Sequence, residues 1–320
     1  MLTLIAGATG FVGRSLAPEL IEDGAEVRCL VRSRDSEAAA PLARAGCELV
    51  EGDVCAEGAL ERALAGIDVA YFLVHMMGRV ENWAEQEQLA ARRFGEAASA
   101  AGVGRVIYLG GLGEDGGRRR GRNVGLSEHL RSRHEVAQVL ERTGPPLTYF
   151  RAAMIVGAGS ESYELLRAIV ERLPAIPTPD WISSRTQPIG IRDTVAYLTA
   201  ALDIAETAGR EVQIGGPDVL THLDVIDAMA RELGEKPPRR LQSPKLLDAM
   251  VDAAATPGAI AAAAGAVTTG NVDVATAITL GLPGDTIVTD PSGMELFDVR
   301  PERFSIALQR AIEDDEEGEE

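Results

Sequence analysis

The chain has 320 residues, of which 46% are apolar, and its formal net charge at pH 7 is −18. This length suits a large α/β unit with an added lobe, and the apolar share is enough for a substantial core without disulfides. The acidic balance argues against nucleic acid as a partner, because nucleic-acid phosphates would be repelled. All but one of residues 313–320 are acidic, so we expect a disordered, solubilising tail there.

The cysteines indicate a reduced chain. Cys29, Cys47 and Cys55 are an odd number and show no spacing typical of metal ligands. Reduced thiols of this kind predict a cytoplasmic location and no metal site. No charged leader precedes an apolar segment, and the longest apolar stretch, near residues 259–267, is too short to span a bilayer. We therefore expect no membrane insertion.

Short apolar segments alternate with helical patterns through the first half of the chain. The expected strands are residues 2–6, 26–31, 48–50, 69–74, 105–109 and 147–151. The expected helices between them are residues 11–22, 37–45, 57–65, 83–101 and 127–142. Six βα units in this order predict an α/β fold with a doubly wound parallel sheet.

The alternation loosens after residue 151. Expected elements here are helices at 160–172, 192–204 and 223–233 and a strand at 211–214. Lys236-Pro237-Pro238 marks a joint, followed by an alanine-rich helical region at 244–264 and a helix at 301–312. We expect one domain over residues 1–235, with part of a substrate lobe at 155–190, and a smaller, mostly helical C-terminal cap over 236–312. The cap is expected to close over the carboxyl ends of the strands, where ligands of such sheets bind.

Three glycines separate the first expected strand from the first helix. Gly7 permits a tight turn, Gly10 lets the backbone approach a pyrophosphate, and Gly13 lets the helix pack close to the strand. Free N–H groups and the helix dipole then face the phosphates. Strand, glycine turn and helix together predict a dinucleotide site in a Rossmann domain. The loop residues expected to hold the cofactor are Gly7, Thr9, Gly10, Phe11, Val12 and Gly13.

The end of the second strand bears on the choice of dinucleotide. It reads Leu30-Val31-Arg32-Ser33-Arg34, with no acid before Asp35. An acid here holds the ribose 2′-hydroxyl of NAD, whereas arginine accepts the 2′-phosphate of NADP. Arg32 and Arg34 therefore favour NADP, and Arg14 is placed to reach the same phosphate. The alternative is that these arginines are solvated loop charges.

Two further strand ends are expected to contact the cofactor. Asp53 suits the adenine amino group while Val54 packs on the ring. Alternatively, Asp53 caps the helix that follows. The fourth strand leads into Val74 and His75, which are expected near the ribose and nicotinamide. His75 is a candidate proton donor there, although a lone histidine is often only a packed side chain.

Several stretches follow the pattern of one known family, and they are residues 7–13, 52–54, 105–112, 126–135, 151–157, 187–189 and 193. On these the chain resembles the atypical, NmrA-like branch of the short-chain dehydrogenase/reductase superfamily, which is related to NAD-dependent epimerases and dehydratases. The resemblance covers roughly the first 235 residues. It implies an NAD(P)-binding protein acting on a small molecule.

The chain departs from this family at the catalytic positions. Catalytic members carry a tyrosine and a lysine spaced YxxxK on the helix after the fifth strand. The resemblance places His129 and Arg133 there, and Gly110 and Gly111 stand where a serine is expected. Arg133 can still bind the ribose, and His129 can donate a proton near neutral pH, with less reach than tyrosine. His129, Arg133 and His75 are therefore the candidate catalytic residues.

Two functions remain open. The favoured one is an NADPH-dependent oxidoreductase that transfers hydride to a small carbonyl, alkene or quinone, because the cofactor itself carries the hydride chemistry. The other is a non-catalytic NADP(H)-binding redox sensor or scaffold protein, as some NmrA-like members are. A homo-oligomer is left open.

A basic cluster in the loop after the fifth strand is the second unusual feature of the chain. It contains Arg118, Arg119, Arg120 and Arg122. One interpretation is a mobile lid that brings arginines onto an anionic substrate or a cofactor phosphate. The other is a solvated loop, in contact with the acidic tail.

Overall fold

The computed structural model describes residues 1–56, 58–76, 82–113, 117–119, 122–124, 128–177, 183–241 and 284–319. Its centre is a seven-stranded sheet in the order β13-β8-β5-β4-β1-β2-β3. The strands are β1 (Leu2–Ala6), β2 (Glu26–Val31), β3 (Glu48–Glu51), β4 (Val69–Phe72), β5 (Arg105–Gly111), β8 (Leu147–Ala152) and β13 (Arg210–Ile214). All neighbouring strands pair in parallel. The doubly wound α/β fold expected from the sequence is confirmed.

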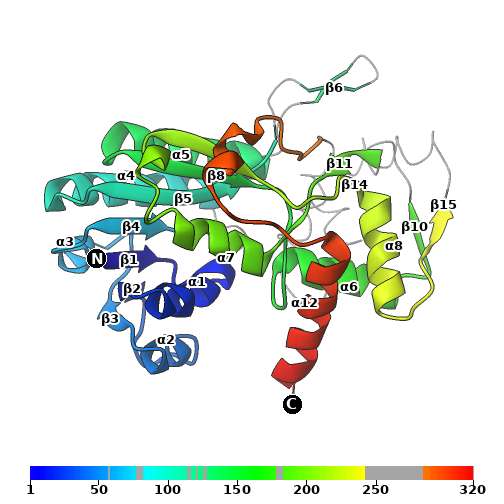
Figure 1. Cartoon of the computed structure of the whole chain (residues 1–320), viewed down its shortest axis with the longest axis horizontal. Helices are drawn as coiled ribbons and strands as arrows, with labels where there is room; N and C mark the ends of the chain where they lie inside the picture. The colour runs from blue at the N-terminus through cyan, green and yellow to red at the C-terminus, as the bar shows by residue number, and fades with distance from the viewer. Residues whose placement is uncertain are drawn as a thin grey trace.

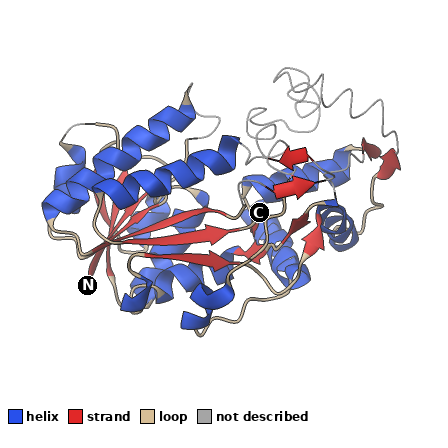
Figure 2. Cartoon of the chain, turned by 90° about the horizontal axis from the view of Figure 1, so that it is seen from above, coloured by secondary structure: helices blue, strands red, loops and turns tan. Residues whose placement is uncertain are grey.

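Helices cover both faces of this sheet (Figure 2). One layer holds α1 (Phe11–Glu22), α2 (Ala40–Arg44) and α7 (Ile191–Ala200), and the other holds α3 (Ala59–Leu64), α4 (Trp83–Ala101) and α5 (Glu128–Thr143). β1 shows why both layers are needed, because successive strand side chains point to opposite faces. Ile5 is buried in the first core, and Leu4 and Ala6 are buried in the second. A strand that is apolar on both sides thus forms the middle of the sheet.

A buried arginine ties the sheet to the end of α7. Arg105 begins β5, and its guanidinium donates hydrogen bonds to the carbonyl oxygens of Ala201, Leu202 and Ile204 at 2.7–3.0 Å. A fourth bond, 2.9 Å long, joins it to the Thr207 hydroxyl. The cation is therefore buried with acceptors on several sides, which offsets its loss of hydration.

A smaller lobe lies beyond the carboxyl ends of the strands. Its core is formed by α6 (Glu161–Arg172), α8 (His222–Glu232) and α12 (Phe304–Glu319), with Tyr163, Met229 and Leu308 fully buried among them. The remaining short elements are β9 (Ile155–Val156), β10 (Ala175–Pro177), β11 (Arg185–Thr186), β12 (Ile189–Gly190), β14 (Leu220–Thr221), β15 (Arg239–Leu241), η2 (Ala205–Thr207) and η3 (Pro291–Leu296). Helices from before and after the joint expected at 236–238 therefore form this lobe together. The helix expected at 244–264 lies outside the described residues.

The end of the chain differs from the sequence prediction. α12 continues to Glu319, so acidic residues after 312 form helix where a disordered tail was expected. The physical reason lies in their partners. Asp315 accepts hydrogen bonds from the Tyr163 hydroxyl, at 3.1 Å, and from Arg167 on α6. Asp314 pairs with Arg192 of α7 at 2.9 Å, and Figure 1 shows α12 beside α6.

The arginine cluster falls on a small hairpin. β6 (Gly117–Arg119) and β7 (Arg122–Val124) pair in antiparallel fashion and project from the body of the molecule, as the β6 label in Figure 1 shows. Arg120 lies outside the described residues. The role of this hairpin stays a prediction, as does its contact with the acidic end of the chain.

Candidate functional site

A cavity of about 670 Å³ opens where the strand order reverses around β1. Open α/β sheets bind ligands at such a position. The cavity runs from the glycine turn, past the ends of β4 and β5, to the lobe. Among the residues that line it are Gly7, Thr9, Gly10, Phe11, Val12, Gly13, Arg14, Arg32, Asp53, Val54, Val74, His75, His129 and Arg133, together with Met154, Ile155, Ser160, Thr186 and His222 from the lobe side. Every expected site residue except Arg34 therefore lies along one cavity.

The glycine turn is built as its spacing predicts. Gly7 has a φ of +92°, and a Cβ placed on it would lie 2.6 Å from the Leu73 carbonyl group. A Cβ on Gly13 would lie 2.3 Å from the Gly7 oxygen, so α1 packs directly on the turn. The first backbone hydrogen bond of α1 runs from the Arg14 N–H to the Gly10 oxygen, at 2.9 Å. The N–H groups that precede it have no partner within the helix and face an incoming anion.

The three arginines expected near a cofactor phosphate differ in their positions. Arg32 lines the cavity, whereas Arg34 does not. The Arg34 backbone N–H donates to Glu51 at 3.2 Å. Arg14 also lines the cavity, but its guanidinium donates to the Ala158 carbonyl at 2.9 Å and lies over the Phe11 ring. Arg32 and Arg14 are thus the two of these arginines that border the cavity.

Asp53 lies where the first interpretation expects it, beside the cavity, and it does not cap the helix that follows. It lines the cavity beside Val54. Its Oδ1 also accepts a hydrogen bond from the Cys55 N–H at 2.7 Å. That bond caps the turn after β3 rather than α3 itself, whose N-cap is Gly58.

Arg133 joins the ends of two strands. Its guanidinium donates to the Val74 carbonyl at 3.4 Å and to the Leu109 carbonyl, and it lies 4.9 Å from the Tyr108 ring centroid. The side chain is 8% exposed. A fixed cation therefore borders the cavity beside the end of β4.

The sequence prediction missed a buried carboxylate behind His75. Glu87 of α4 is 1% exposed. One of its oxygens accepts hydrogen bonds from His75 Nδ1, at 2.6 Å, and from the Met76 N–H, at 2.7 Å. The other accepts from the Ser132 hydroxyl of α5 at 3.0 Å. Burial alone would raise the pKa of Glu87, but the His75 hydrogen bond and the Arg133 charge outweigh it and lower the pKa to about 2.

His129 has a different environment from His75. The two rings lie 5.3 Å apart between centroids. His129 Nδ1 is buried and has no hydrogen-bond partner in the described part of the chain. Burial lowers the pKa of His129 to about 3, and the charges of His75 and Arg133 add to this effect. The His129 ring is therefore neutral near neutral pH.

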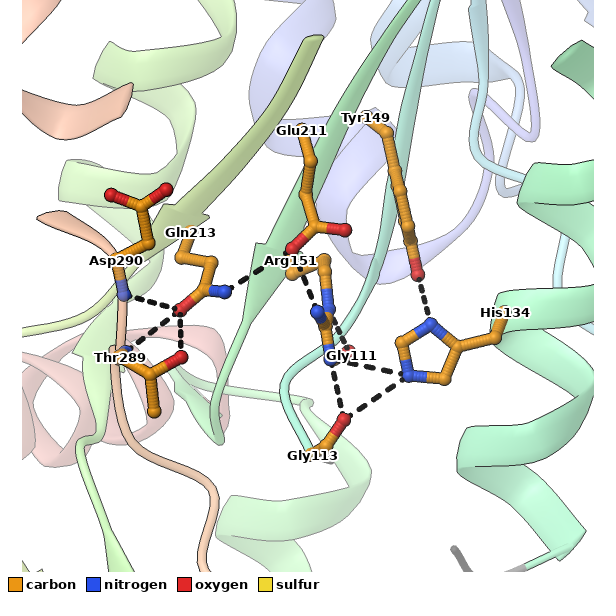
Figure 3. A network of polar contacts seen from close by, with 9 residues as sticks. All are labelled: Gly111, Gly113, His134, Tyr149, Arg151, Glu211, Gln213, Thr289 and Asp290. Carbon is orange, nitrogen blue, oxygen red and sulfur yellow. Dashed lines mark hydrogen bonds and ion pairs between the residues drawn. The ribbon is translucent and has the colours of Figure 1, made fainter. Parts of the chain in front are cut away.

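A second polar network holds the loop after β5 (Figure 3). Arg151 of β8 donates to the carbonyls of Gly111 and Gly113 and pairs with Glu211 at 2.7 Å. His134 of α5 lies 3.0 Å from the Tyr149 hydroxyl and 3.2 Å from the Arg151 guanidinium. This network fixes the segment in which Gly110 and Gly111 line the cavity.

The sheet order, the glycine turn and the cavity define a Rossmann-type NAD(P)-binding protein. The NmrA-like family model matches residues 2–270, and the chain belongs to the NmrA-like family. Its described residues contain no cluster of metal-ligating side chains and no helix with the length and apolarity needed to cross a bilayer.

Individual relatives carry different names. The chain is 30% identical over 264 residues to ceramide reductase of Caulobacter vibrioides, with 78% of this chain and 77% of that protein covered. It is 24% identical over 236 residues to photosystem II assembly factor Ycf39 of Trieres chinensis, covering 73% and 70%. A solved NADPH-dependent quinone oxidoreductase from Escherichia coli superposes with a TM-score of 0.71 at 17% identity, covering 98% and 99%. At that identity the likeness is one of fold.

Proposed function

We propose that the protein is an NADP(H)-dependent oxidoreductase that transfers hydride between the cofactor and a small carbonyl, alkene or quinone. The observation that carries the proposal is the single cavity that joins the glycine turn to His75, His129 and Arg133. Such a cavity can hold a nicotinamide against a substrate seated on the lobe side. The names of the ceramide reductase and the quinone oxidoreductase are consistent with this class.

The residues present fit the cofactor. The turn tolerates no side chain at Gly7 or Gly13. The first turn of α1, whose N–H groups have no acceptor within a helix, lines the cavity where a pyrophosphate would bind. Arg32 would hold the 2′-phosphate of the adenosine half, and Arg133 would hold the nicotinamide ribose beside Val74. When bound, NADPH supplies the hydride, and the protein must supply orientation and a proton.

A pair of arginine variants tests the choice of cofactor. Arg32→Ala is expected to weaken NADPH binding by about 10- to 100-fold, because a charged hydrogen bond contributes roughly 1.5–3 kcal/mol. NADH binding should change little. Arg34→Ala is the matched control, since this neighbouring arginine does not line the cavity. Equal affinity of the wild type for NADH and NADPH would overturn the assignment of NADP.

A turnover assay separates the enzyme from its alternative. The alternative is a non-catalytic NADP(H)-binding sensor or scaffold protein, which the assembly-factor name of one relative favours. Purified protein is incubated with NADPH and a panel of aldehydes, ketones, enones and quinones, and absorbance at the nicotinamide band is followed. Oxidation with any member supports the enzyme. Tight NADPH binding without oxidation by any of them would favour the alternative.

A further inference from the structure

Among the residues that the structure describes, Glu87 is the most deeply buried acid near the cavity, and its hydrogen-bond donors come from other segments. It accepts hydrogen bonds from the His75 ring, the Met76 N–H and the Ser132 hydroxyl. Burying a carboxylate is costly unless its oxygens are paired in this way. The Glu87 carboxylate thus links the segment after β4 to α4 and α5, and two of its three hydrogen-bond donors, His75 and Met76, belong to residues that line the cavity.

We infer that Glu87 is a positioning residue that fixes His75 as the proton donor and acceptor of the proposed reaction. The inference rests on the proposed function. An ionised carboxylate can only accept a hydrogen bond, so the His75 nitrogen beside it, Nδ1, must carry a proton. The nitrogen left for a substrate is then Nε2. The His75 side chain is 33% exposed and lines the cavity, so a substrate can reach the ring.

The proton and the hydride balance in this arrangement. During reduction of a carbonyl, the substrate carbon takes the hydride that NADPH supplies, and the C=O π bond opens. The substrate oxygen takes the proton from Nε2 of doubly protonated His75, which gives an alcohol and NADP⁺. His75 is left neutral with its proton on Nδ1, and Glu87 stays ionised throughout. In the oxidative direction the Nε2 lone pair accepts the alcohol proton, and the Glu87 charge stabilises the imidazolium that forms.

The charges around the two histidines favour His75 over His129. Glu87 of α4 contacts the His75 ring directly, the His129 ring of α5 lies 5.3 Å from the His75 ring between centroids, and the Arg133 charge acts on Glu87. The Nδ1 of His129 is buried without an acceptor in the described residues. Burial and the charges of His75 and Arg133 outweigh the Glu87 charge and lower the pKa of His129 to about 3. A neutral, unpaired ring is a poor acid. His129 therefore serves as a wall of the cavity beside His75.

Two variants of Glu87 separate positioning from mere packing. In Glu87→Gln, the amide oxygen can still accept from His75 and Met76, and the amide nitrogen can donate to Ser132. Glu87→Leu removes every acceptor. Histidines are labelled with ¹⁵N, and the ring tautomer of neutral His75 is measured by NMR on the full chain. We expect the Nδ1–H form in the wild type and in Glu87→Gln, and a mixture of tautomers in Glu87→Leu.

The same variants are assayed for turnover and for NADPH binding. We expect kcat to fall about 10- to 100-fold in Glu87→Gln, which loses the charge, and further in Glu87→Leu, because acid–base catalysis typically contributes 10²–10⁴-fold. The Kd for NADPH should stay within about twofold. Gln88→Leu is the matched control: Gln88 also links α4 to α5, through Glu135 at 2.8 Å, and does not line the cavity.

The results distinguish this inference from the proposed function. A wild-type protein that binds NADPH but oxidises it with no substrate contradicts the enzyme, while the NMR measurement still decides whether Glu87 sets the tautomer. A proton on Nε2 of neutral wild-type His75 overturns the inference even if Glu87→Leu fails to fold. Unchanged kcat in both Glu87 variants overturns it as well.

Discussion

Replacing His129 by phenylalanine tests the electrostatics of the buried imidazole. The pKa of His129 is lowered from 6.5 to about 3, first by burial and then by the charges of His75 and Arg133. Between these values the unfolded chain binds a proton that the folded protein does not bind. The free energy of unfolding of the wild type therefore falls as pH drops from about 6.5 towards 3.

The size of this effect follows from the width of the pH range between the two pKa values of His129. Each pH unit within it costs about 1.4 kcal/mol of unfolding free energy. The lower edge is set at pH 4.5, the ordinary pKa of a glutamate, so that Glu87 does not contribute. From pH 6.5, where the unfolded histidine is already half protonated, to pH 4.5, the proton on His129 accounts for about 2 kcal/mol. The His129→Phe variant has no such proton, so it should lose about 2 kcal/mol less stability than the wild type over this range.

Urea denaturation at pH 6.5, 5.5 and 4.5, followed by circular dichroism, measures the difference. His129→Leu guards against overpacking by the larger ring. Glu87→Gln is the control, because the pKa shift of Glu87 changes the stability only below pH 4.5. The lowered pKa of Glu87, about 2, stabilises the fold fully above pH 4.5, and this contribution is lost as pH falls towards 2. Parallel loss of stability in the wild type and both His129 variants between pH 6.5 and 4.5 would refute the reasoning.

Three other substitutions test the fold. Gly13→Ala forces its Cβ to within 2.3 Å of the Gly7 oxygen. We expect the free energy of unfolding, measured by urea denaturation, to fall by about 1–3 kcal/mol, and NADPH binding to weaken. An unchanged Kd for NADPH would contradict the close packing of α1 on the turn. Arg105→Met leaves the carbonyl acceptors at the end of α7 unpaired. We expect the free energy of unfolding to fall by about 3 kcal/mol. A fall of less than about 1 kcal/mol would argue against a stabilising role of the hydrogen bonds of Arg105. Asp315→Asn removes the charge that Tyr163 and the α6 arginine share, and faster hydrogen exchange confined to the last two turns of α12 is the expected result.

Local signals predicted the elements that depend on neighbouring residues. The glycine spacing located the turn between β1 and α1, and α1 and α4 have the expected bounds of 11–22 and 83–101. β4 ends at Phe72 rather than at Val74. The reason is not local: β1, its partner, ends at Ala6, which pairs with Phe72. The Val74 carbonyl instead accepts a hydrogen bond from Arg133.

The polar groups that complete the site depend on contacts between distant segments. Glu87 was visible in the sequence as a charge on the buried side of a helix, next to Ala90, Ala91 and Phe94. That position marked it as unusual, yet its partners lie in the segment after β4 and on α5, and they could not be inferred from residue spacing. The helical acidic end was missed for the same reason, because Asp315 finds its partners on α6, about 150 residues earlier in the chain.

The central position of β1 has a consequence for synthesis of the protein. One edge of this strand can pair as soon as β2 leaves the ribosome, but the other edge must wait for β4. The face that α1 and α2 cover is completed later still, when α7 has been translated and Tyr71 can donate to the Leu198 carbonyl. In a nascent chain, the glycine turn is therefore synthesised long before the helices and strands that surround it. A fragment that ends after β8 would leave an apolar face open to water, and it would be a poor substitute for the whole protein in binding studies.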